Sequence, residues 1–528
     1  MKKLLVFFVL LSLSAFAQAA TYYVSNSASN GFSVGFNTHT TTDAQSMAKP
    51  WLTISTANVK SSDGDTLIVN DGTYTESAGV GYLSIDKNLT VTPYSDYGVT
   101  VKSLSATRVV NIQTAGKTIT LGKIVIDGEY VRSYPLHIGI NTLLTLNGTW
   151  VKNGANYAIL ADGVSGDTVM NGAILTGTAT VIAAYYESGS RTVSGSLTIS
   201  SVTISETGIT NAAGGGIVWI PAITTGTFSM TNSVITSSGN VAHSSIRVAN
   251  TSNALISGNT IQYMHGTGYG IWSYSSAAAN ISSSPVIVGN IVNHNGTAGI
   301  MILAGTDGSG VADNRHNDAR IYGNICTGSV NSTTLHGIMV GSAKGGIVFG
   351  NKVSYATLPL LSKLSSGTSF VGNEVKNIQG GTSGSGMRSK GSTNITFAHN
   401  GIYLNQTSYG AYTDHDTVVP TYSNNINYVG NNIYQDSASA LFATVASSST
   451  ANFVGNNYYS TTALNANQWS YIGTSYATLA AWKAAKEPSA TSNPLTSYPK
   501  KTTIPGAPDA WDTSGNWLKR DSSYGFGF

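Results

Sequence analysis

The stretch between residues 256 and 456 repeats one short motif, in which a β-type pair precedes Gly-Asn. It reads ISGN at 256–259, IVGN at 287–290, IYGN at 321–324, VFGN at 348–351, FVGN at 370–373, FAHN at 397–400, YVGN at 428–431 and FVGN at 453–456. Successive motifs lie 22 to 34 residues apart, without a 3.6-residue periodicity inside the units. A fixed motif at variable spacing indicates coils that share strands and a turn but differ in loop length. Asn at a tight turn can adopt the left-handed conformation and bond the next coil's Asn, so we expect a structural asparagine ladder.

A second motif, Gly followed by alternating apolar and other residues, interleaves with the first. It occurs as GIVW at 216–219, GIWSY at 270–274, GIMIL at 299–303, GIMV at 337–340, GMRSK at 386–390 and GAYTD at 410–414. Period-two alternation is typical of a strand with one buried face. Several short strands per unit, separated by Ser, Thr, Asn and Gly, predict an all-β chain folded as a single right-handed parallel β-helix.

The ends of such a stack are open sheet edges and need covering. Residues 51–59 are expected to form a short capping helix at one end, and residues 475–487 at the other. The sequence divides into a signal peptide at 1–19, an N-terminal cap with the first coils at 20–100, the β-helix with a substrate groove at 101–465, and a C-terminal cap helix with an extended tail at 466–528.

The first residues have the order of a secretory signal. Lys2 and Lys3 precede the apolar run at 4–16, and Ala-Gln-Ala follows at 17–19. We therefore expect a secreted or periplasmic protein. Cys326 is the single cysteine, so no internal disulfide can form, and its strand-like surroundings indicate a buried small residue.

Charge excludes several classes of function. Only 10% of residues are charged, and removing two of the 27 basic residues with the signal leaves 25 against 24 acidic ones. A chain so nearly neutral has no global field to gather nucleic acid or an anionic membrane. No segment after the signal is apolar for long enough to span a bilayer. We expect a monomer whose affinity for any anion is local.

The start of the mature chain resembles secreted right-handed β-helix proteins of the pectate-lyase-like superfamily. The matching stretches are TYYVS at 21–25, KPWLTI at 49–54, GDTLIV at 64–69 and GTY at 72–74. Within that superfamily, LSKLS at 361–365 and MRSKG at 387–391 resemble the alginate lyase and chondroitinase B family. That resemblance implies that Lys363 abstracts a proton and that Arg388, or Lys390 when counted back from Asn400, is its partner; the family's Arg-His-Gly is Arg-Ser-Lys-Gly here.

Strand alternation gives an independent selection of outward-facing residues. If the apolar residue after each Gly points inward, the residues beside it form an outward row on successive strands about 4.8 Å apart. Lys363, Arg388, Lys390, Tyr412 and Asp414 would then form one compact polar patch, and three cations on two neighbouring strands are notable in a chain so poor in charge. The whole row comprises Arg247, Trp272, Tyr274, Met301, Leu303, Met339, Leu361, Lys363, Arg388, Lys390, Tyr412 and Asp414.

Each of these residues also has a simpler interpretation. The two lysines can be solvated residues that protect the ends of strands from aggregation. A one-residue slip would bury Trp272 in the core. Asp-His-Asp at 414–416 can be a turn whose carboxylates bond nearby backbone.

A cationic and aromatic groove on an exported β-helix suits an acidic, uronic-acid-containing polysaccharide such as alginate. β-Elimination needs a group that neutralises the C6 carboxylate, a base for the C5 proton and an acid for the leaving O4. We expect Arg388 or Lys390 to neutralise the carboxylate, Lys363 to be the base, and Tyr412 or His415 to be the acid. The substrate-binding residues are expected to be Trp272, Tyr274, Arg247, Met301, Met339 and Asp414.

Metal and alternative activities remain open at this stage. Calcium can assist such chemistry, and Asp307, Asp313, Asp318 and Glu374 could be ligands, although no spacing identifies a site. TDHD at 413–416 resembles the Asp-Pro-His-Asp signature of alginate C5 epimerases. Asp414 and Asp416 could instead be the carboxylate pair of a glycoside hydrolase. The fourth possibility is a glycan-binding β-helix without catalytic activity.

Overall fold

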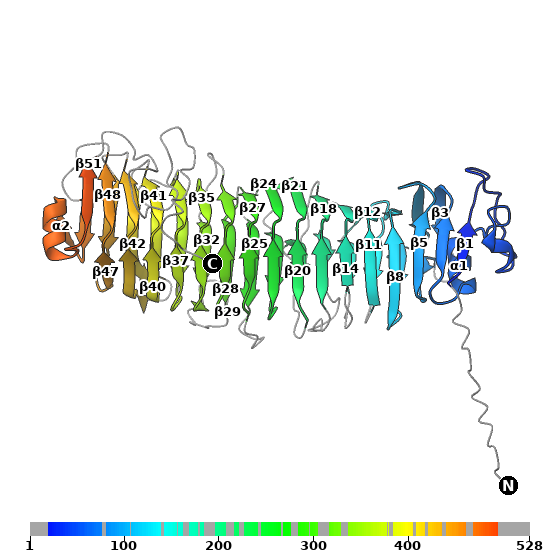
Figure 1. The fold of residues 1–528 in the computed structure, drawn as a ribbon, viewed down its shortest axis with the longest axis horizontal. Helices are drawn as coiled ribbons and strands as arrows, with labels where there is room; N and C mark the ends of the chain where they lie inside the picture. The colour runs from blue at the N-terminus through cyan, green and yellow to red at the C-terminus, as the bar shows by residue number, and fades with distance from the viewer. Residues whose placement is uncertain are drawn as a thin grey trace, which may run out of the picture.

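The computed structural model shows a long, all-β stack with one small helix at each end (Figure 1). It describes residues 19–494 apart from 77–80, 106, 139–141, 156, 162–167, 178–179, 184–195, 207–215, 221–225, 241–243, 266–267, 276–282, 295, 305–315, 329–335, 377, 380–383, 405–407, 418–420, 436–439 and 461–467. The expected signal peptide and the end of the expected tail lie outside these residues. The predicted right-handed parallel β-helix is confirmed.

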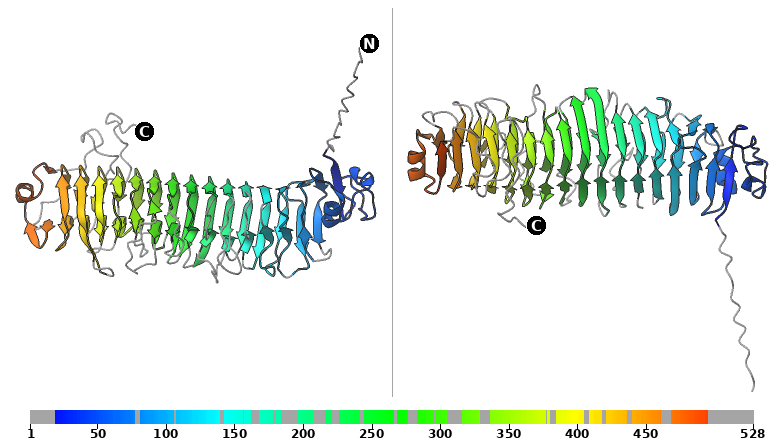
Figure 2. Two further views of the ribbon diagram at one scale, coloured as in Figure 1. Left: turned by 90° about the horizontal axis from the view of Figure 1, so that it is seen from below. Right: turned by 45° about the horizontal axis from the view of Figure 1, so that its top comes forward.

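Three parallel sheets run the length of the stack, and each coil adds one strand to each sheet (Figure 2). Sheet A contains, in spatial order, β1 (Thr21–Val24), β2 (Thr66–Val69), β5 (Leu89–Pro93), β8 (Lys117–Gly122), β11 (Thr142–Asn147), β14 (Thr168–Asn171), β17 (Leu197–Ser200), β20 (Phe228–Thr231), β23 (Ala254–Ser257), β26 (Val286–Val288), β30 (Arg320–Tyr322), β34 (Ile347–Phe349), β37 (Ser369–Val371), β40 (Thr393–Ala398), β44 (Asn424–Val429) and β47 (Ala451–Val454).

Sheet B follows sheet A around each coil. It contains β3 (Gly72–Glu76), β6 (Val99–Ser103), β9 (Val125–Asp127), β12 (Trp150–Gly154), β15 (Ile174–Gly177), β18 (Thr203–Glu206), β21 (Val234–Asn240), β24 (Thr260–His265), β27 (Ile291–His294), β31 (Ile325–Thr327), β35 (Lys352–Ser354), β38 (Glu374–Lys376), β41 (Gly401–Leu404), β45 (Asn432–Gln435), β48 (Asn457–Ser460) and β51 (Thr491–Pro494).

Sheet C closes each coil and carries the Gly-apolar motif. Its parallel strands are β4 (Leu83–Ser84), β7 (Val110–Ile112), β10 (Leu136–Ile138), β13 (Tyr157–Ala161), β16 (Thr180–Ala183), β19 (Gly216–Ile220), β22 (Ser244–Ala249), β25 (Tyr269–Ser275), β28 (Ala298–Ala304), β32 (His336–Gly341), β36 (Leu358–Lys363), β39 (Ser385–Lys390), β42 (Tyr409–Asp416), β46 (Leu441–Val445) and β49 (Trp469–Tyr471). Two short antiparallel strands join it, β43 (Thr421–Tyr422) beside β42 and β50 (Thr474–Tyr476) beside β49. Strands β29 (His316–Asn317) and β33 (Ala343–Lys344) form a separate pair.

The ends are covered as the sequence predicts, by helices shorter than expected. Helix α1 spans Ile54–Lys60 at one end, after a 3-10 turn at Asp43–Gln45, and α2 spans Leu479–Ala485 at the other (Figure 1). The predicted start of the second helix, around Ser475, is a strand instead. The buried Glu76 carboxylate accepts the amides of Ile54 and Ser55 and so anchors the start of α1.

One continuous hydrophobic core fills the interior of the stack. Within it, the rings of Phe370, Phe397, Tyr428 and Phe453 lie parallel on successive coils, with centroids 4.8 to 5.2 Å apart. Trp482 of α2 meets the last of these rings edge-on at 5.0 Å. The C-terminal helix therefore seals an aromatic column that begins several coils below it. Cys326 belongs to this core, as predicted, and its burial raises the pKa of its thiol.

The predicted asparagine ladder is present at one corner of the stack. All eight asparagines of the Gly-Asn motif are buried, and in seven consecutive steps each donates its backbone and side-chain amides to the Oδ1 of the next, at 2.8 to 3.0 Å. The last one, Asn456, donates to the buried carboxylate of Glu487 just after α2. The ladder thus ends on an anion rather than on an open edge.

One detail of the predicted turn is wrong. The residue before each ladder asparagine, and not the asparagine, has the left-handed conformation, with φ of 59° to 65° at the glycines and 54° at His399. Only glycine enters this region without a steric cost. The ladder asparagines are not among the residues with positive φ, and their side chains run along the ladder.

Candidate functional site

The outward row predicted on sheet C is confirmed by the strand register. Arg247, Trp272, Met301, Met339, Leu361, Arg388 and Tyr412 are successive Cα partners on seven neighbouring strands. A parallel row joins Tyr274, Leu303, Gly341, Lys363, Lys390 and Asp414. The residues between them, such as Ser389 and Thr413, are fully buried on the interior side. From residue 270 onwards, the Gly-apolar motif therefore predicts which face of sheet C each side chain occupies.

Five charged side chains meet at the C-terminal end of this row, and we call them the charged cluster: Lys363, Arg388, Lys390, Asp414 and Asp416. Arg388 Nη2 lies 2.6 Å from Asp414 Oδ2. The Nζ atoms of Lys363 and Lys390 lie 3.9 and 3.5 Å from Oδ2 of Asp416. Three cations against two carboxylates leave a single formal positive charge. The carboxylates are almost completely buried, so they hold the cations in fixed positions.

Asp416 is the member of the cluster that the sequence-based selection of site residues missed. The sequence suggests it only as part of a turn at 414–416, as part of the epimerase-like stretch at 413–416, or as one carboxylate of a hydrolase pair. These residues instead end strand β42, which turns back to pair with β43. Alternation from Tyr412 through Asp414 points to Asp416 as the next outward residue, so the signal was present in the sequence.

His415 does not join the charged cluster. It lies between two outward-facing carboxylates on the strand, and its ring packs on Tyr422 of β43 with centroids 5.7 Å apart. Tyr412 is better placed than His415 for chemistry with the cluster. Its ring lies under the Arg388 guanidinium, 4.8 Å from Cζ, and stacks on Tyr409 at 4.8 Å.

Burial raises the pKa of the Tyr412 phenol, and the neighbouring Asp414 carboxylate raises it further, whereas Arg388 lowers it. The net direction is upward, so the phenol stays protonated at neutral pH. A protonated phenol beside a guanidinium can donate a proton to a leaving oxygen and cannot serve as a base.

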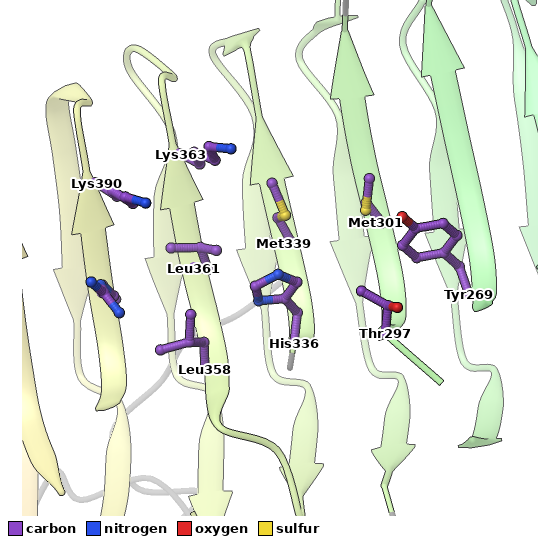
Figure 3. Close-up of a pocket in the computed structure, with 10 residues that line it drawn as sticks. Tyr269, Thr297, Met301, His336, Met339, Leu358, Leu361, Lys363 and Lys390 are labelled. Carbon is purple, nitrogen blue, oxygen red and sulfur yellow. The ribbon is translucent and has the colours of Figure 1, made fainter. Parts of the chain in front are cut away.

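A pocket of about 240 Å³ opens beside the charged cluster. Lys363, Arg388 and Lys390 line one side of it, and in Figure 3 both labelled lysines lie above the apolar residues. The remaining lining consists of Leu358, Leu361, His336, Met339, Met301, Thr297 and Tyr269. The two methionines were expected to contact substrate on an open groove. They are instead only 3% exposed and line the interior of this pocket.

Aromatic residues surround Arg247 further along the same row. Its Cζ lies 4.4 Å from the ring centroid of Trp272, 5.9 Å from Tyr274 and 6.0 Å from Trp219. Tyr269 packs on Trp272 at 4.8 Å. We call these five residues the aromatic platform. Burial lowers the pKa of Arg247, and the tyrosines oppose this shift.

Four strand steps separate Trp272 from Arg388, which at about 4.8 Å per step is roughly 19 Å. Trp219 was not selected from the sequence, because the rule that places Trp272 outward, two residues after its glycine, points to Val218 in the stretch at 216–219, and Val218 is fully buried. The register partner of Trp219 is Arg247, which places it in the outward row. The platform and the charged cluster therefore lie on one face of one sheet.

Within the described part of the chain, no three His, Cys, Asp or Glu side chains come together as a metal site would require. Asp307 and Asp313, two of the considered calcium ligands, lie outside the described residues. The described helices include none that is long and apolar enough to cross a membrane.

Comparison with known proteins finds similarity in structure alone. No protein-family model matches this sequence, and no curated protein sequence matches it. The chain is similar to a periplasmic alginate epimerase, at 13% identity over 73% of this chain and 83% of that one, with a TM-score of 0.40.

Two further solved structures are similar over most of this chain. One is a mannuronic-acid-specific family 6 polysaccharide lyase from the human gut microbiota, at 8% identity, 82% and 86% coverage and a TM-score of 0.34. The other is tailspike protein 3 of bacteriophage CBA120, at 10% identity, 87% and 64% coverage and a TM-score of 0.36. None of these likenesses assigns an activity to this chain.

Proposed function

We propose that the protein is an exported polysaccharide lyase that cleaves a uronic-acid-containing polymer by β-elimination. The observation that carries this proposal is the placement of Lys363, Arg388 and Lys390, from two neighbouring strands, along one side of the pocket. Cations fixed beside a cavity suit a carboxylated ligand, because they replace the water that solvates the carboxylate outside the site.

The proposed reaction uses four side chains. Lys390 and Arg388 bind the C6 carboxylate and stabilise the negative charge that develops when C5 loses its proton. Lys363, in its neutral form, accepts that proton on Nζ. The C5–H electron pair becomes the C4–C5 double bond as the C4–O4 bond breaks, and the Tyr412 phenol donates its proton to O4. An ammonium group has three N–H donors, so Lys390 can contact Asp416 and a substrate carboxylate at the same time.

The two aspartates have positioning roles in this scheme. Asp414 orients the Arg388 guanidinium, and Asp416 sets the separation of the two lysines through a single oxygen. A general acid of a glycoside hydrolase must carry a proton in the ground state. Both carboxylates instead contact cations, Asp414 the Arg388 guanidinium and Asp416 the two lysines. This pairing supports elimination over hydrolysis.

The aromatic platform is proposed to bind sugar units some distance from the bond that is cleaved. Tryptophan and tyrosine rings offer flat apolar faces to the C–H groups of sugars, and roughly 19 Å separates them from Arg388 along the row. A polymer that spans both regions would run along the stack axis. This arrangement favours a long polysaccharide over a short oligosaccharide, and residues 1–19 are proposed to direct the protein out of the cytoplasm.

The test is the formation of unsaturated uronate ends, followed by ultraviolet absorbance, when purified protein meets alginate, pectate, chondroitin sulfate or dermatan sulfate, with and without calcium. Lys363→Ala should abolish the signal. Lys344→Ala is the matched control, because Lys344 is an exposed lysine on the neighbouring β33 and lines no part of the pocket. Activity retained by Lys363→Ala would refute the assignment of the base.

Product analysis separates the other activities. An epimerase begins with the same proton abstraction but changes the sugar composition without shortening the polymer, which nuclear magnetic resonance detects. A hydrolase creates reducing ends without ultraviolet absorbance. A binding protein leaves the polymer unchanged. Any of these three results would contradict the lyase proposal.

A further inference from the structure

The floor of the pocket is aliphatic, although it faces outward from the β-helix. Met301, Met339 and Leu361 are register partners on β28, β32 and β36, and Leu303 and Leu358 flank them. These residues form a hydrophobic cluster separate from the interior core. Charged and aromatic residues occupy the same outward row on both sides of this floor, Arg247 and Trp272 on one side and Arg388 and Tyr412 on the other. The floor is therefore an aliphatic stretch between two regions of different character.

An unsubstituted sugar is a poor ligand for such a floor. Its ring hydroxyls need hydrogen-bond partners once they leave water, and methionine and leucine side chains supply none. Of the aromatic residues that line the pocket, Tyr269 lies at the side away from the lysines and His336 lies below Met339 (Figure 3). The floor therefore suits a part of the ligand that is itself apolar, and the flexible methionines can adapt to its shape.

The apolar part must lie close to the anionic part. Leu361 is the register partner of Arg388, so the floor begins one strand spacing, about 4.8 Å, from the cations, and Met339 lies one further spacing away. This span accommodates one sugar ring with a short substituent. The cavity of about 240 Å³ is also below the roughly 300–1,000 Å³ of pockets for drug-sized ligands, which excludes a long acyl chain.

The chemistry further restricts where the substituent is attached. A methyl ester at C6 would remove the negative charge that the cations recognise. A small acyl group on a ring hydroxyl keeps the carboxylate and also removes a hydroxyl that the floor cannot satisfy. We propose that the pocket selects uronate units that carry a small O-acyl group, such as O-acetyl, whose methyl group packs on Met301, Met339 and Leu361. This selection rests on the proposed action on a uronic-acid polymer.

The test compares each polyuronate in an O-acetylated form with the same polymer after mild alkaline deacetylation. Cleavage by the intact protein gives kcat/KM, and binding to Lys363→Ala gives affinity without turnover. A pocket that buries one added methyl group discriminates by about tenfold, so we expect kcat/KM and affinity to favour the acetylated form by that factor. Leu361→Asn and Met339→Gln should reduce the ratio towards one, mainly by weakening binding of the acetylated form.

Leu255→Asn is the matched control, because Leu255 is an outward-facing leucine on β23 of sheet A, 39% exposed and remote from sheet C. It should leave the ratio unchanged. Equal kcat/KM and equal affinity for the two forms would overturn the inference, as would a preference that survives both pocket substitutions.

The binding arm keeps this inference separate from the proposed reaction. Acetyl-dependent binding without unsaturated products would refute the lyase and support the pocket assignment. Elimination without acetyl preference would support the lyase and refute the pocket assignment. Absence of binding to every acetylated polymer would overturn both.

Discussion

Replacing Glu487 by Gln tests how the C-terminal end of the β-helix is closed. This carboxylate is fully buried and accepts four hydrogen bonds. Its Oε1 takes the backbone and side-chain amides of Asn456 at 2.7 and 2.8 Å, and its Oε2 takes the Tyr458 hydroxyl at 2.7 Å and Trp482 Nε1 at 2.9 Å. Burial, and then the charge of Glu487, raise the pKa of Tyr458 well above its ordinary value, so the phenol is present as a donor.

The size of the destabilisation follows from which of the four hydrogen bonds the Gln side-chain amide can still form. The oxygen of Gln can still accept both Asn456 groups, but its NH₂ would face two donors. The tyrosine hydroxyl can rotate to accept, whereas an indole N–H cannot, so Trp482 loses its acceptor inside the protein. An unsatisfied buried donor costs about 1–3 kcal/mol, and bonds to a neutral acceptor are roughly 1 kcal/mol weaker than those to a charged one. With both Asn456 bonds weakened and the indole donor unsatisfied, the free energy of unfolding should fall by about 3–5 kcal/mol.

The assay is urea unfolding followed by tryptophan fluorescence, because Trp482 and Trp469 lie 6.5 Å apart beside the substitution. Glu129→Gln is the matched control, since Glu129 is partly exposed and pairs with Lys102 on the surface. A midpoint for Glu487→Gln that coincides with that of the control would refute the argument that this carboxylate closes the ladder.

Three further predictions concern the site and the core. Asp416→Asn should reduce kcat at least tenfold, because the two lysines lose the negative charge that holds them around one oxygen; an unchanged kcat would contradict its positioning role. Trp272→Ala should raise KM for long polymers about fivefold to tenfold and leave kcat and short-oligosaccharide cleavage unchanged, since stacking is lost equally from the ground and transition states; an equal effect on short substrates would refute the platform. Burial lowers the pKa of His316 to about 4, so the unfolded chain takes up a proton below pH 6.5 that the folded chain refuses until about pH 4. As the pH falls from 6.5 to 4, His316 should therefore lower the free energy of unfolding by up to about 3 kcal/mol. In unfolding measured across this pH range, His316→Gln should remove that part of the decline.

The repeating corner and the face of sheet C were predictable because each depends on a local rule. One buried face makes alternation strict, so a glycine followed by an inward apolar residue determines the direction of Arg388 and Lys390 together. The asparagine ladder follows from a motif that returns once per coil. Neither prediction needs a distance between residues far apart in the sequence.

The ion pairs and the pocket could not be predicted, because they depend on distances between residues that are far apart in the sequence. Alternation points to Asp416 two residues beyond Asp414, but the sequence does not distinguish a continued strand from a turn at 414–416. The pairing of β42 with β43 shows that the strand continues and that His415 lies beside Tyr422. The strand pattern predicts that Met301 and Met339 point outward from the β-helix. It does not predict that they are buried, because their burial depends on neighbouring residues from other coils.

The asparagine ladder, which has the same geometry in every coil that it joins, has a consequence for how such a protein can change during evolution. Ladder asparagines recur after as few as 22 residues or as many as 34, and yet their hydrogen bonds have the same length. Duplication or deletion of the segment from one ladder asparagine to the next would preserve the corner and return the following strand to its register. The chain could thus gain or lose whole rungs, and with them positions along the row between the aromatic platform and the charged cluster, without redesign of its core. Natural relatives with a different number of rungs would be expected to prefer polymers of correspondingly different length.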